Sequence, residues 1–338
     1  MEWSTPTLAD VLRARTAIAP YLRPTPTIEA TALGALLGCR VYLKCENLTP
    51  TGAFKVRGGI NLLATLTPEE RARGVLGVST GNHAQSIAYA ARLFGARALI
   101  YMPAGANPLK VAATRALGAE VVLTGRDFDE ARVAAEERAA RDGLRYIHSA
   151  NEPLLIAGVG TYALELLEAV PDLEVIIVPV GAGSGVLGTA TVAHAVNPAI
   201  RVIGVQSEGA PAVYLSWRAG RRIETEQITT FAEGLATRQP FDLPLALLPR
   251  LVNDMMLVSD DELRRAIVML LDKARQVVEG AGAAPLAAAL RRRDDLAGKK
   301  VGLVLSGGNI TLDQLRELLN AEPAGQGLPT PAGTMVEN

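Results

Sequence analysis

The sequence predicts an α/β protein with two open, mostly parallel, twisted sheets that helices cover on both faces. Short apolar runs alternate with amphipathic segments of helical period, first at residues 75–79 and 84–94. The alternation resumes after the middle of the chain, at residues 155–169 and 175–180. Strands that alternate with helices form parallel sheets with both faces covered. At 338 residues, of which 49% are hydrophobic, the chain is long enough for two packed regions.

The remaining elements follow from apolar spacing and from residues that begin or end helices. We expect a long irregular stretch up to Pro249 and a flexible tail at residues 321–338, which are rich in Pro, Gly and Thr. The other predicted helices are 7–19, 30–37, 60–66, 68–72, 110–117, 127–141, 188–196, 210–219 and 260–271, and the other predicted strands are 41–44, 98–102, 120–123, 200–206, 255–258 and 300–305.

Composition excludes several classes of function. A formal net charge of -1 provides no basic surface for nucleic acid or for an anionic membrane. The N-terminus has no basic segment followed by an apolar run, and no stretch has transmembrane length, so a cytoplasmic location is expected. Cys39 and Cys45 fit neither a disulfide framework nor a four-ligand zinc site, and we interpret both as packing residues.

One lysine has an unusual setting. Lys55 lies in the segment 51–59, TGAFKVRGG, between small residues and next to Phe54, just ahead of a predicted helix. The chain has six lysines and 28 arginines. A lysine whose pKa is lowered by desolvation can form a Schiff base, whereas the alternative is a surface lysine at a turn.

A polar segment at the end of a predicted strand suggests an anion site. Residues 79–85, STGNHAQ, stand where a strand ends and a helix begins. Ligands of open α/β sheets bind outside the carboxyl ends of strands, and helix N-termini offer unpaired N–H groups. A substrate carboxylate would fit there, although an ordinary helix cap is the alternative.

A glycine loop follows the strand at 175–180. Gly181, Gly183, Gly185 and Gly188 have neither the G-x-G-x-x-G spacing of dinucleotide sites nor the Gly-Lys-Ser/Thr of a P-loop. Backbone amides in such a loop can bind a phosphate at the helix N-terminus. A small phosphorylated ligand is therefore favoured over a nucleotide.

The last predicted strand ends in Ser306-Gly307-Gly308-Asn309. The Ser306 hydroxyl could bind a ring nitrogen, or the segment could be a tight turn. A reactive lysine, a carboxylate site, a phosphate loop and a neutral partner for a ring together describe a pyridoxal phosphate enzyme that acts on an amino acid.

Four ordered segments, AFKVRGG, STGNHAQ, VGAGSG and LSGGN, resemble those of the threonine/serine dehydratase and serine racemase family. The resemblance covers residues 5–318 and implies the tryptophan synthase β-like fold, fold type II of pyridoxal phosphate enzymes. It implies a large cofactor-binding domain of residues 1–50 and 149–320 and a small substrate-closing domain of residues 51–148. The cofactor would lie in the cleft between them.

The resemblance also implies a role for each site residue. The catalytic residues would be Lys55, which forms the Schiff base and acts as general base, and Thr80. The substrate carboxylate would be bound by Ser79, Thr80, Gly81 and His83. The cofactor pyridoxal 5'-phosphate would be bound by Phe54, Lys55, Asn82, Gly181, Ala182, Gly183, Ser184, Gly185, Glu279 and Ser306, with Ser306 at the pyridine nitrogen.

The expected reaction is dehydration and deamination of L-threonine, and of L-serine, to a 2-oxo acid and ammonia. The chain ends about 30 residues after Ser306, which leaves no room for the C-terminal regulatory domain of the biosynthetic threonine dehydratases. The fold commonly forms dimers, so a homodimer or a higher homo-oligomer is expected.

Three alternatives remain open. Thr80 stands where racemases of the family have a catalytic serine, so the enzyme could be a serine racemase. It could also be a dehydratase of 3-hydroxyaspartate or of a phenylserine-like substrate. A non-catalytic protein that binds a phosphorylated metabolite is the third alternative. No metal is predicted, because Glu208 resembles a cation ligand of the racemases but the acidic ligand six residues later is replaced by Tyr214.

Overall fold

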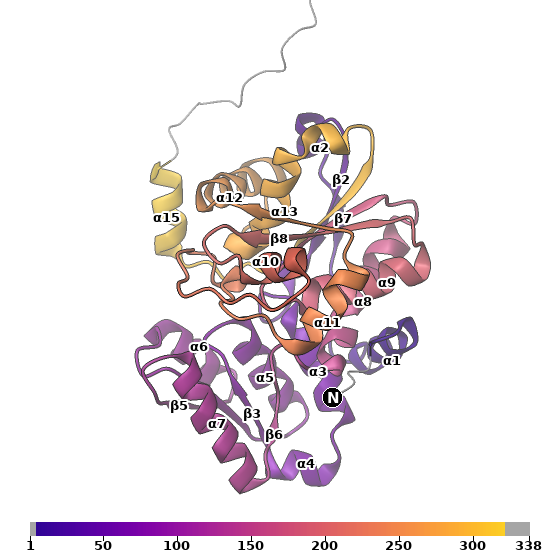
Figure 1. Ribbon diagram of the computed structural model, residues 1–338. Coiled ribbons are helices and arrows are strands. Elements are labelled where there is room, and N and C mark those ends of the chain that lie inside the picture. The colour runs from indigo at the N-terminus through magenta and orange to yellow at the C-terminus, as the bar shows by residue number, and fades with distance from the viewer. Residues whose placement is uncertain (1–4, 322–338) are drawn as a thin grey trace, which may run out of the picture.

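Two sheets form the framework of the computed structural model, which describes residues 5–321 (Figure 1). The six-stranded sheet has the order β1-β2-β10-β7-β8-β9, and the four-stranded sheet has the order β5-β4-β3-β6. All neighbouring strands are parallel except β1 and β2. The predicted α/β fold with two mostly parallel sheets is confirmed. The strands are β1 (Thr27–Glu29), β2 (Arg40–Cys45), β3 (Val75–Val78), β4 (Ala98–Met102), β5 (Glu120–Leu123), β6 (Arg145–Tyr146), β7 (Val175–Pro179), β8 (Arg201–Ser207), β9 (Asp254–Val258) and β10 (Lys300–Leu305).

Most helices lie where apolar spacing predicts them. They are α1 (Leu8–Ile18), α2 (Thr31–Leu37), α3 (Lys55–Thr65), α4 (Pro68–Arg73), α5 (Asn82–Leu93), α6 (Pro108–Ala116), α7 (Phe128–Asp142), α8 (Pro153–Ala169), α9 (Ser184–Val196), α10 (Ala212–Ala219), α11 (Asp242–Leu251), α12 (Asp260–Ala274), α13 (Gly280–Arg291), α14 (Arg293–Leu296) and α15 (Leu312–Ala321), with short 3-10 turns η1 (Glu46–Leu48) and η2 (Glu233–Leu235). The expected tail of residues 321–338 falls outside the described residues except for Ala321, which is the last residue of α15 and so does not belong to a tail.

The prediction of an irregular stretch up to Pro249 is wrong, because α11 lies within it. Pro244 stands in the first turn of α11, where no backbone N–H has a partner inside the helix. Pro249 comes two residues before its end. Leu243 and Leu247 are buried against the six-stranded sheet. Tertiary burial therefore stabilises a helix that local propensity disfavours.

Helix α13 was not predicted, because it begins with Gly-Ala-Gly-Ala-Ala-Pro. Small residues are needed here for close packing: a Cβ atom at Gly282 would lie 2.5 Å from the carbonyl oxygen of Gly307. Alanines fill half of the rest of this helix, which contacts α12 and the strands β7 and β10. A segment whose composition is typical of a loop thus forms the buried helix α13.

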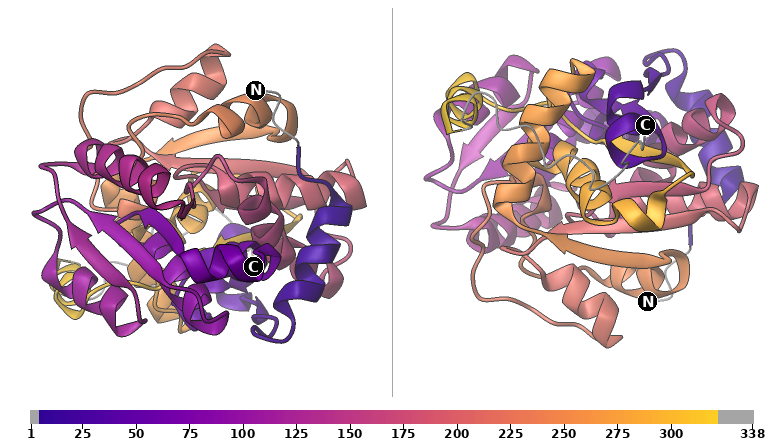
Figure 2. Two further views of the ribbon diagram at one scale, coloured as in Figure 1. Left: turned by 90° about the horizontal axis from the view of Figure 1, so that it is seen from below. Right: turned by 90° about the horizontal axis from the view of Figure 1, so that it is seen from above.

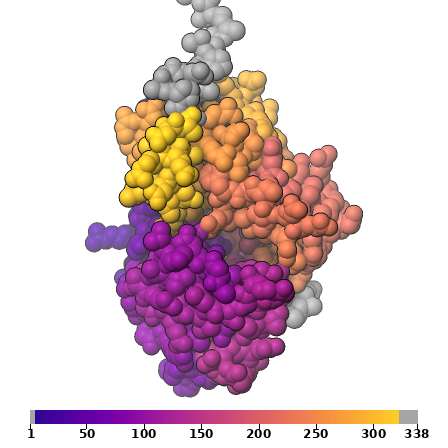
Figure 3. All heavy atoms as spheres, turned by 90° about the vertical axis from the view of Figure 1, so that its left-hand side faces the viewer, coloured from indigo at the N-terminus to yellow at the C-terminus, as the bar shows by residue number. Residues whose placement is uncertain are grey.

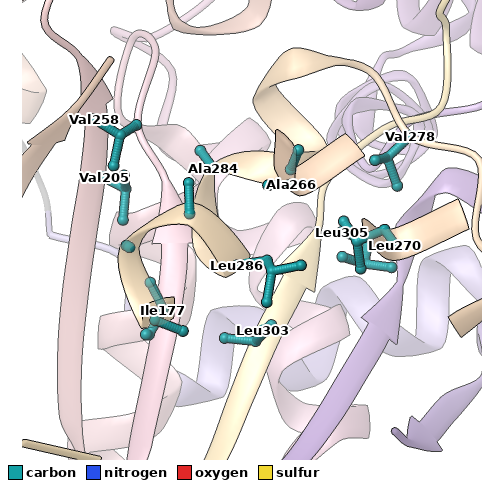
Figure 4. Packing of buried hydrophobic residues seen from close by; sticks show 14 of the residues in the cluster. Ile177, Val205, Val258, Ala266, Leu270, Val278, Ala284, Leu286, Leu303 and Leu305 are labelled. Carbon is teal, nitrogen blue, oxygen red and sulfur yellow. The ribbon is translucent and has the colours of Figure 1, made fainter. Parts of the chain in front are cut away.

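Helices cover both faces of the six-stranded sheet. Successive side chains of a strand point to opposite faces, so Ile177 packs with α12 and α13, whereas Ile176 packs with α8 and α9. Figure 4 shows the first of these clusters, in which Leu303 of β10 lies near Leu286 of α13, and Val205 of β8 lies beside Val258 of β9.

The four-stranded sheet has α3 and α5 on one face and α7 on the other. Figures 1 and 2 show this sheet and its helices, in purple to magenta, as a body beside the six-stranded sheet. Its strands come from residues 75–146, and the other sheet takes strands from both sides of that segment. The domain boundaries at residues 50/51 and 148/149 stay a prediction. No helix within residues 5–321 is long and apolar enough to span a membrane.

Candidate active site

A cavity of about 970 Å³ lies where β3, β7 and β10 end. Its lining includes every residue that the sequence proposes for the site: Phe54, Lys55, Ser79, Thr80, Gly81, Asn82, His83, Gly181, Ala182, Gly183, Ser184, Gly185, Glu279 and Ser306. Figure 3 shows the surface hollowed where the magenta and orange parts of the chain meet. Segments far apart in the sequence therefore share one space, while the chemical roles of their residues stay predictions.

Lys55 is the first residue of α3 rather than a residue ahead of the helix. Its Nζ donates to the Ser184 hydroxyl at 2.7 Å and lies 3.4 Å from the Ser149 carbonyl oxygen. The Phe54 ring centroid is 5.3 Å from Nζ. Burial of the ammonium group lowers the pKa of Lys55 to about 8. An appreciable fraction of the amine is therefore neutral, and able to act as nucleophile or base, near neutral pH.

A buried ionic cluster anchors α3. The Arg57 guanidinium binds the carboxylates of Glu46 and Glu165, at 2.7 and 2.6 Å, and Lys44 binds Glu165 at 2.5 Å. Two cations face two anions, so the cluster has no net charge. The side chains of Lys44, Glu46 and Arg57 are at most 1% exposed. The motif AFKVRGG contains the arginine, but nothing in the sequence identifies its partners.

The start of α5 presents free amides to the cavity. No side chain caps this helix. The Ser79 hydroxyl accepts from the N–H of Gly81 at 3.1 Å, and among the described residues the N–H groups of residues 82–84 have no acceptor. An ordinary side-chain cap, the alternative for this segment, is therefore wrong. The arrangement fits a carboxylate that accepts from several N–H groups.

His83 has a buried ring that contacts the backbone just after β6. Its Nε2 lies 3.2 Å from the Ile147 carbonyl oxygen, which requires a proton on Nε2. Burial, reinforced by the positive charge of Lys55, lowers the pKa of His83 to about 3. The ring is neutral and holds α5 against the end of β6, so only the backbone N–H of His83 is suited to bind a carboxylate.

The glycine loop before α9 leaves a row of backbone N–H groups without acceptors among the described residues. Gly183 has a φ of 104°, which glycine adopts without strain. A Cβ atom at Gly181 would overlap the Gly234 carbonyl oxygen. None of the N–H groups of residues 182–186 donates to another described residue. Unpaired amides at a helix N-terminus match a phosphate, so the loop fits pyridoxal phosphate.

A hydrogen-bond chain links the two sides of the cavity. Asn82 Nδ2 donates to Glu279 at 2.7 Å, and Asn309 Nδ2 donates to Asn82 Oδ1 at 2.8 Å and to the Thr51 carbonyl oxygen at 2.9 Å. Burial raises the pKa of Glu279 to about 7, although the Asn82 hydrogen bond opposes this shift. Ser306 lies nearby, 3% exposed. Asn309 belongs to the motif LSGGN, but its role in this chain is not predicted from the sequence.

Two ion pairs cross the mouth of the cavity. Lys110 of α6 pairs with Glu233 of η2, and Asp129 of α7 pairs with Arg238 at 2.8 Å. All four residues line the cavity. Each pair joins an element beside the four-stranded sheet to the segment before α11. No sequence signal identifies these pairs, because they depend on how the two sheets are placed.

Glu208, the residue that resembles a cation ligand, is paired with Arg291 at 3.3 Å. Within residues 5–321, no group of three or more His, Cys, Asp or Glu side chains is placed to hold a metal ion. The absence of a tightly bound structural metal stays a prediction.

The comparisons with known proteins agree with this geometry. The family model described as "Pyridoxal-phosphate dependent enzyme" matches residues 18–307. The chain is 42% identical to the L-threonine ammonia-lyase of Thermotoga maritima, over 93% of this chain and 78% of that protein. It is 36% identical to the L-threo-3-hydroxyaspartate ammonia-lyase of Saccharomyces cerevisiae, over 95% and 98%. The structure of maize serine racemase superposes with a TM-score of 0.89 at 33% identity, covering 94% of this chain and 98% of that one.

Proposed function

The chain belongs to the family of pyridoxal-phosphate dependent enzymes, and from that premise we propose that it is a lyase that converts L-threonine, and also L-serine, to a 2-oxo acid and ammonia. The observation that carries the proposal is the meeting of the Lys55 amine with two sets of free amides in one cavity. One set, at the start of α9, suits a phosphate, and the other, at the start of α5, suits a carboxylate. The 42% identity to an L-threonine ammonia-lyase supports the choice of reaction.

When bound, pyridoxal phosphate supplies an electron-withdrawing ring that stabilises negative charge at the substrate α-carbon. We assign its phosphate to the amides of residues 182–186 and its ring to the space beside Phe54, Asn82 and Ser306. Ser306 carries a hydroxyl and no charge, so it would hydrogen-bond a ring nitrogen without forcing protonation as a carboxylate would. Two observations support the placement of the phosphate: the N–H groups of residues 182–186 have no acceptor among the described residues, and Gly181 has no room for a side chain.

Lys55 would move the proton. In its neutral form the Nζ atom can accept the proton from the α-carbon, and a pKa of about 8 leaves enough neutral amine for this. The amides at the start of α5 would hold the substrate carboxylate so that the α-carbon faces Nζ. The β-hydroxyl leaves with a proton as water. A water molecule later replaces the amino group, so L-threonine yields 2-oxobutanoate and ammonia.

The charges of the cavity favour a substrate with an uncharged side chain. The lining holds four basic side chains. Of these, Lys110 pairs with Glu233, Arg238 with Asp129, and Arg132 with Glu136, so Lys55 is the one described cation there without a carboxylate partner. A second substrate carboxylate, as in 3-hydroxyaspartate, would need a free cation. Threonine and serine are therefore favoured over 3-hydroxyaspartate as substrates.

Racemisation is the second candidate, because Thr80 lines the cavity and maize serine racemase has the same fold at 33% identity. The β-methyl group of threonine restricts its χ1 rotation, which disfavours Thr80 as the second acid/base. The two reactions differ in their products, so one experiment separates them.

The test is proton NMR in heavy water of the enzyme with pyridoxal phosphate and, separately, L-threonine, L-serine and L-threo-3-hydroxyaspartate. We expect 2-oxobutanoate and pyruvate from the first two substrates and slower conversion of the third. Loss of the α-proton signal with serine retained would instead establish racemisation. No change with any of the three would refute the proposed lyase.

We also propose that the chain forms a homodimer or a higher homo-oligomer in the cytoplasm. Leu48 and Val277 are 55% and 44% exposed. They lie on adjoining segments, since Asn47 donates to the carbonyl oxygen of Val277. Two neighbouring exposed apolar side chains make this place a candidate for a contact between copies of the chain. Sedimentation velocity should give a dimer or larger species, and Leu48→Glu should shift the distribution toward monomer.

A further inference from the structure

Ser184 makes a contact that a phosphate-binding role does not explain. It is the first residue of α9 and is 2% exposed. Its Oγ accepts from Lys55 Nζ at 2.7 Å, and Nζ has no other described acceptor closer than 3.4 Å. A serine hydroxyl has two lone pairs and one proton. In the described residues Oγ donates to no acceptor, so its proton is free for an anion at the adjacent amides.

We propose that Ser184 is a positioning residue for Lys55: its hydroxyl holds the free amine in place and bridges it to the anion bound at the start of α9. This inference rests on the proposed cofactor but not on the proposed substrate. In the ammonium form, Nζ donates to Oγ and the Ser184 proton points to the anion. The hydroxyl thus stabilises the charged form of the lysine.

The surroundings of Lys55 determine whether the Ser184 hydroxyl raises or lowers the pKa of the lysine. Burial favours the neutral amine, and the Ser184 hydrogen bond opposes it. The described titratable groups that face Lys55 are His83 of α5 and His148, which follows β6. Burial lowers the pKa of His83 to about 3 and that of His148 to about 4, so both are neutral above pH 6. Removal of the hydroxyl should therefore lower the pKa of Lys55 further, by about one unit.

The experiment uses the full-length chain, stripped of cofactor with hydroxylamine and then given pyridoxal phosphate between pH 6 and pH 10. The rate of cofactor capture on Lys55 is followed by absorbance, and borohydride reduction with peptide mass spectrometry identifies the lysine. The variants are Ser184→Ala and Ser184→Gly, which both remove the hydroxyl, and Ser184→Thr, which keeps one. Thr191→Val is the matched control, because Thr191 lies on the same helix and its buried hydroxyl has no described partner.

The rate of cofactor capture should fall toward low pH as Lys55 becomes protonated. In Ser184→Ala and Ser184→Gly we expect this fall to occur about one pH unit lower than in the wild type. Ser184→Thr and Thr191→Val should follow the wild type. The inference is overturned if the capture rate of Ser184→Ala has the same pH dependence as that of the wild type. It is also overturned if the pH dependence of Thr191→Val shifts as far as that of Ser184→Ala. If the wild type captures no pyridoxal phosphate, both the inference and the cofactor assignment are refuted. A wild type that captures the cofactor but leaves threonine unchanged would refute the lyase alone.

Discussion

Arg57 and Glu46 form a two-point ion pair in the protein interior, with Nε–Oε2 and Nη2–Oε1 distances of 2.7 and 2.8 Å. Arg57 stands two residues after Lys55, on the same first turn of α3. The pair therefore fixes the helix end that carries the reactive amine.

Breaking this pair should destabilise the protein strongly. Arg57→Leu leaves the carboxylates of Glu46 and Glu165 with less positive charge in the interior, and we expect a loss of about 3–5 kcal/mol of unfolding free energy. Urea unfolding measures the change. Arg13→Leu, which breaks an exposed pair with Asp10, is the control and should have no measurable effect. A loss at Arg57 as small as that at Arg13 would contradict the role of the cluster.

Replacement of the amine should abolish turnover while leaving the fold intact. We expect Lys55→Ala to reduce kcat with L-threonine by at least about 10³-fold, because it removes both the nucleophile and the base. The rate of 2-oxobutanoate formation is the measurement. Lys273→Ala, on an exposed part of α12, is the control. Substantial turnover in Lys55→Ala would show that Lys55 is not a catalytic residue.

Glu279 should make stability depend on pH. Its folded pKa of about 7 lies above the ordinary value of 4.5, so the folded state binds more protons than the unfolded state between these values. The Glu279 carboxyl alone should therefore reduce the free energy of unfolding of the cofactor-free protein by up to about 3 kcal/mol as the pH rises from about 4.5 to 7. The lowered pKa values of His83 and His148 act in the opposite direction over this range, so the effect of Glu279 is measured against a variant. Urea unfolding across this range should show the stability of the wild type falling relative to that of Glu279→Gln as the pH rises. Equal slopes in both proteins would assign the pH dependence to other groups.

The ion pairs at the cavity mouth should determine discrimination against acidic substrates. Glu233→Gln frees the ammonium group of Lys110. We expect kcat/KM for 3-hydroxyaspartate, relative to threonine, to rise up to about five-fold. Asp313→Asn, which breaks an exposed pair with Arg316, is the control. An unchanged ratio in Glu233→Gln would place the substrate side chain away from the mouth.

The sequence by itself determined the elements whose information is local. Apolar periodicity identified most strands and helices, because burial on one face imposes a period of 2 or 3.6 on the residues themselves. The motifs around Lys55, Asn82, Ser184 and Ser306 could be assigned to one site, since the carboxyl ends of parallel strands lie on the same edge.

The tertiary structure alone decided which side chains meet. Buried charges carry no sequence signature of their partners: Arg57 and Glu165 are 108 residues apart. Helices α11 and α13 contradict local propensity and form because burial outweighs it. The contact between Lys55 and Ser184 and the ion pairs at the mouth depend on the relative placement of separate elements, which is set by packing rather than by any single segment.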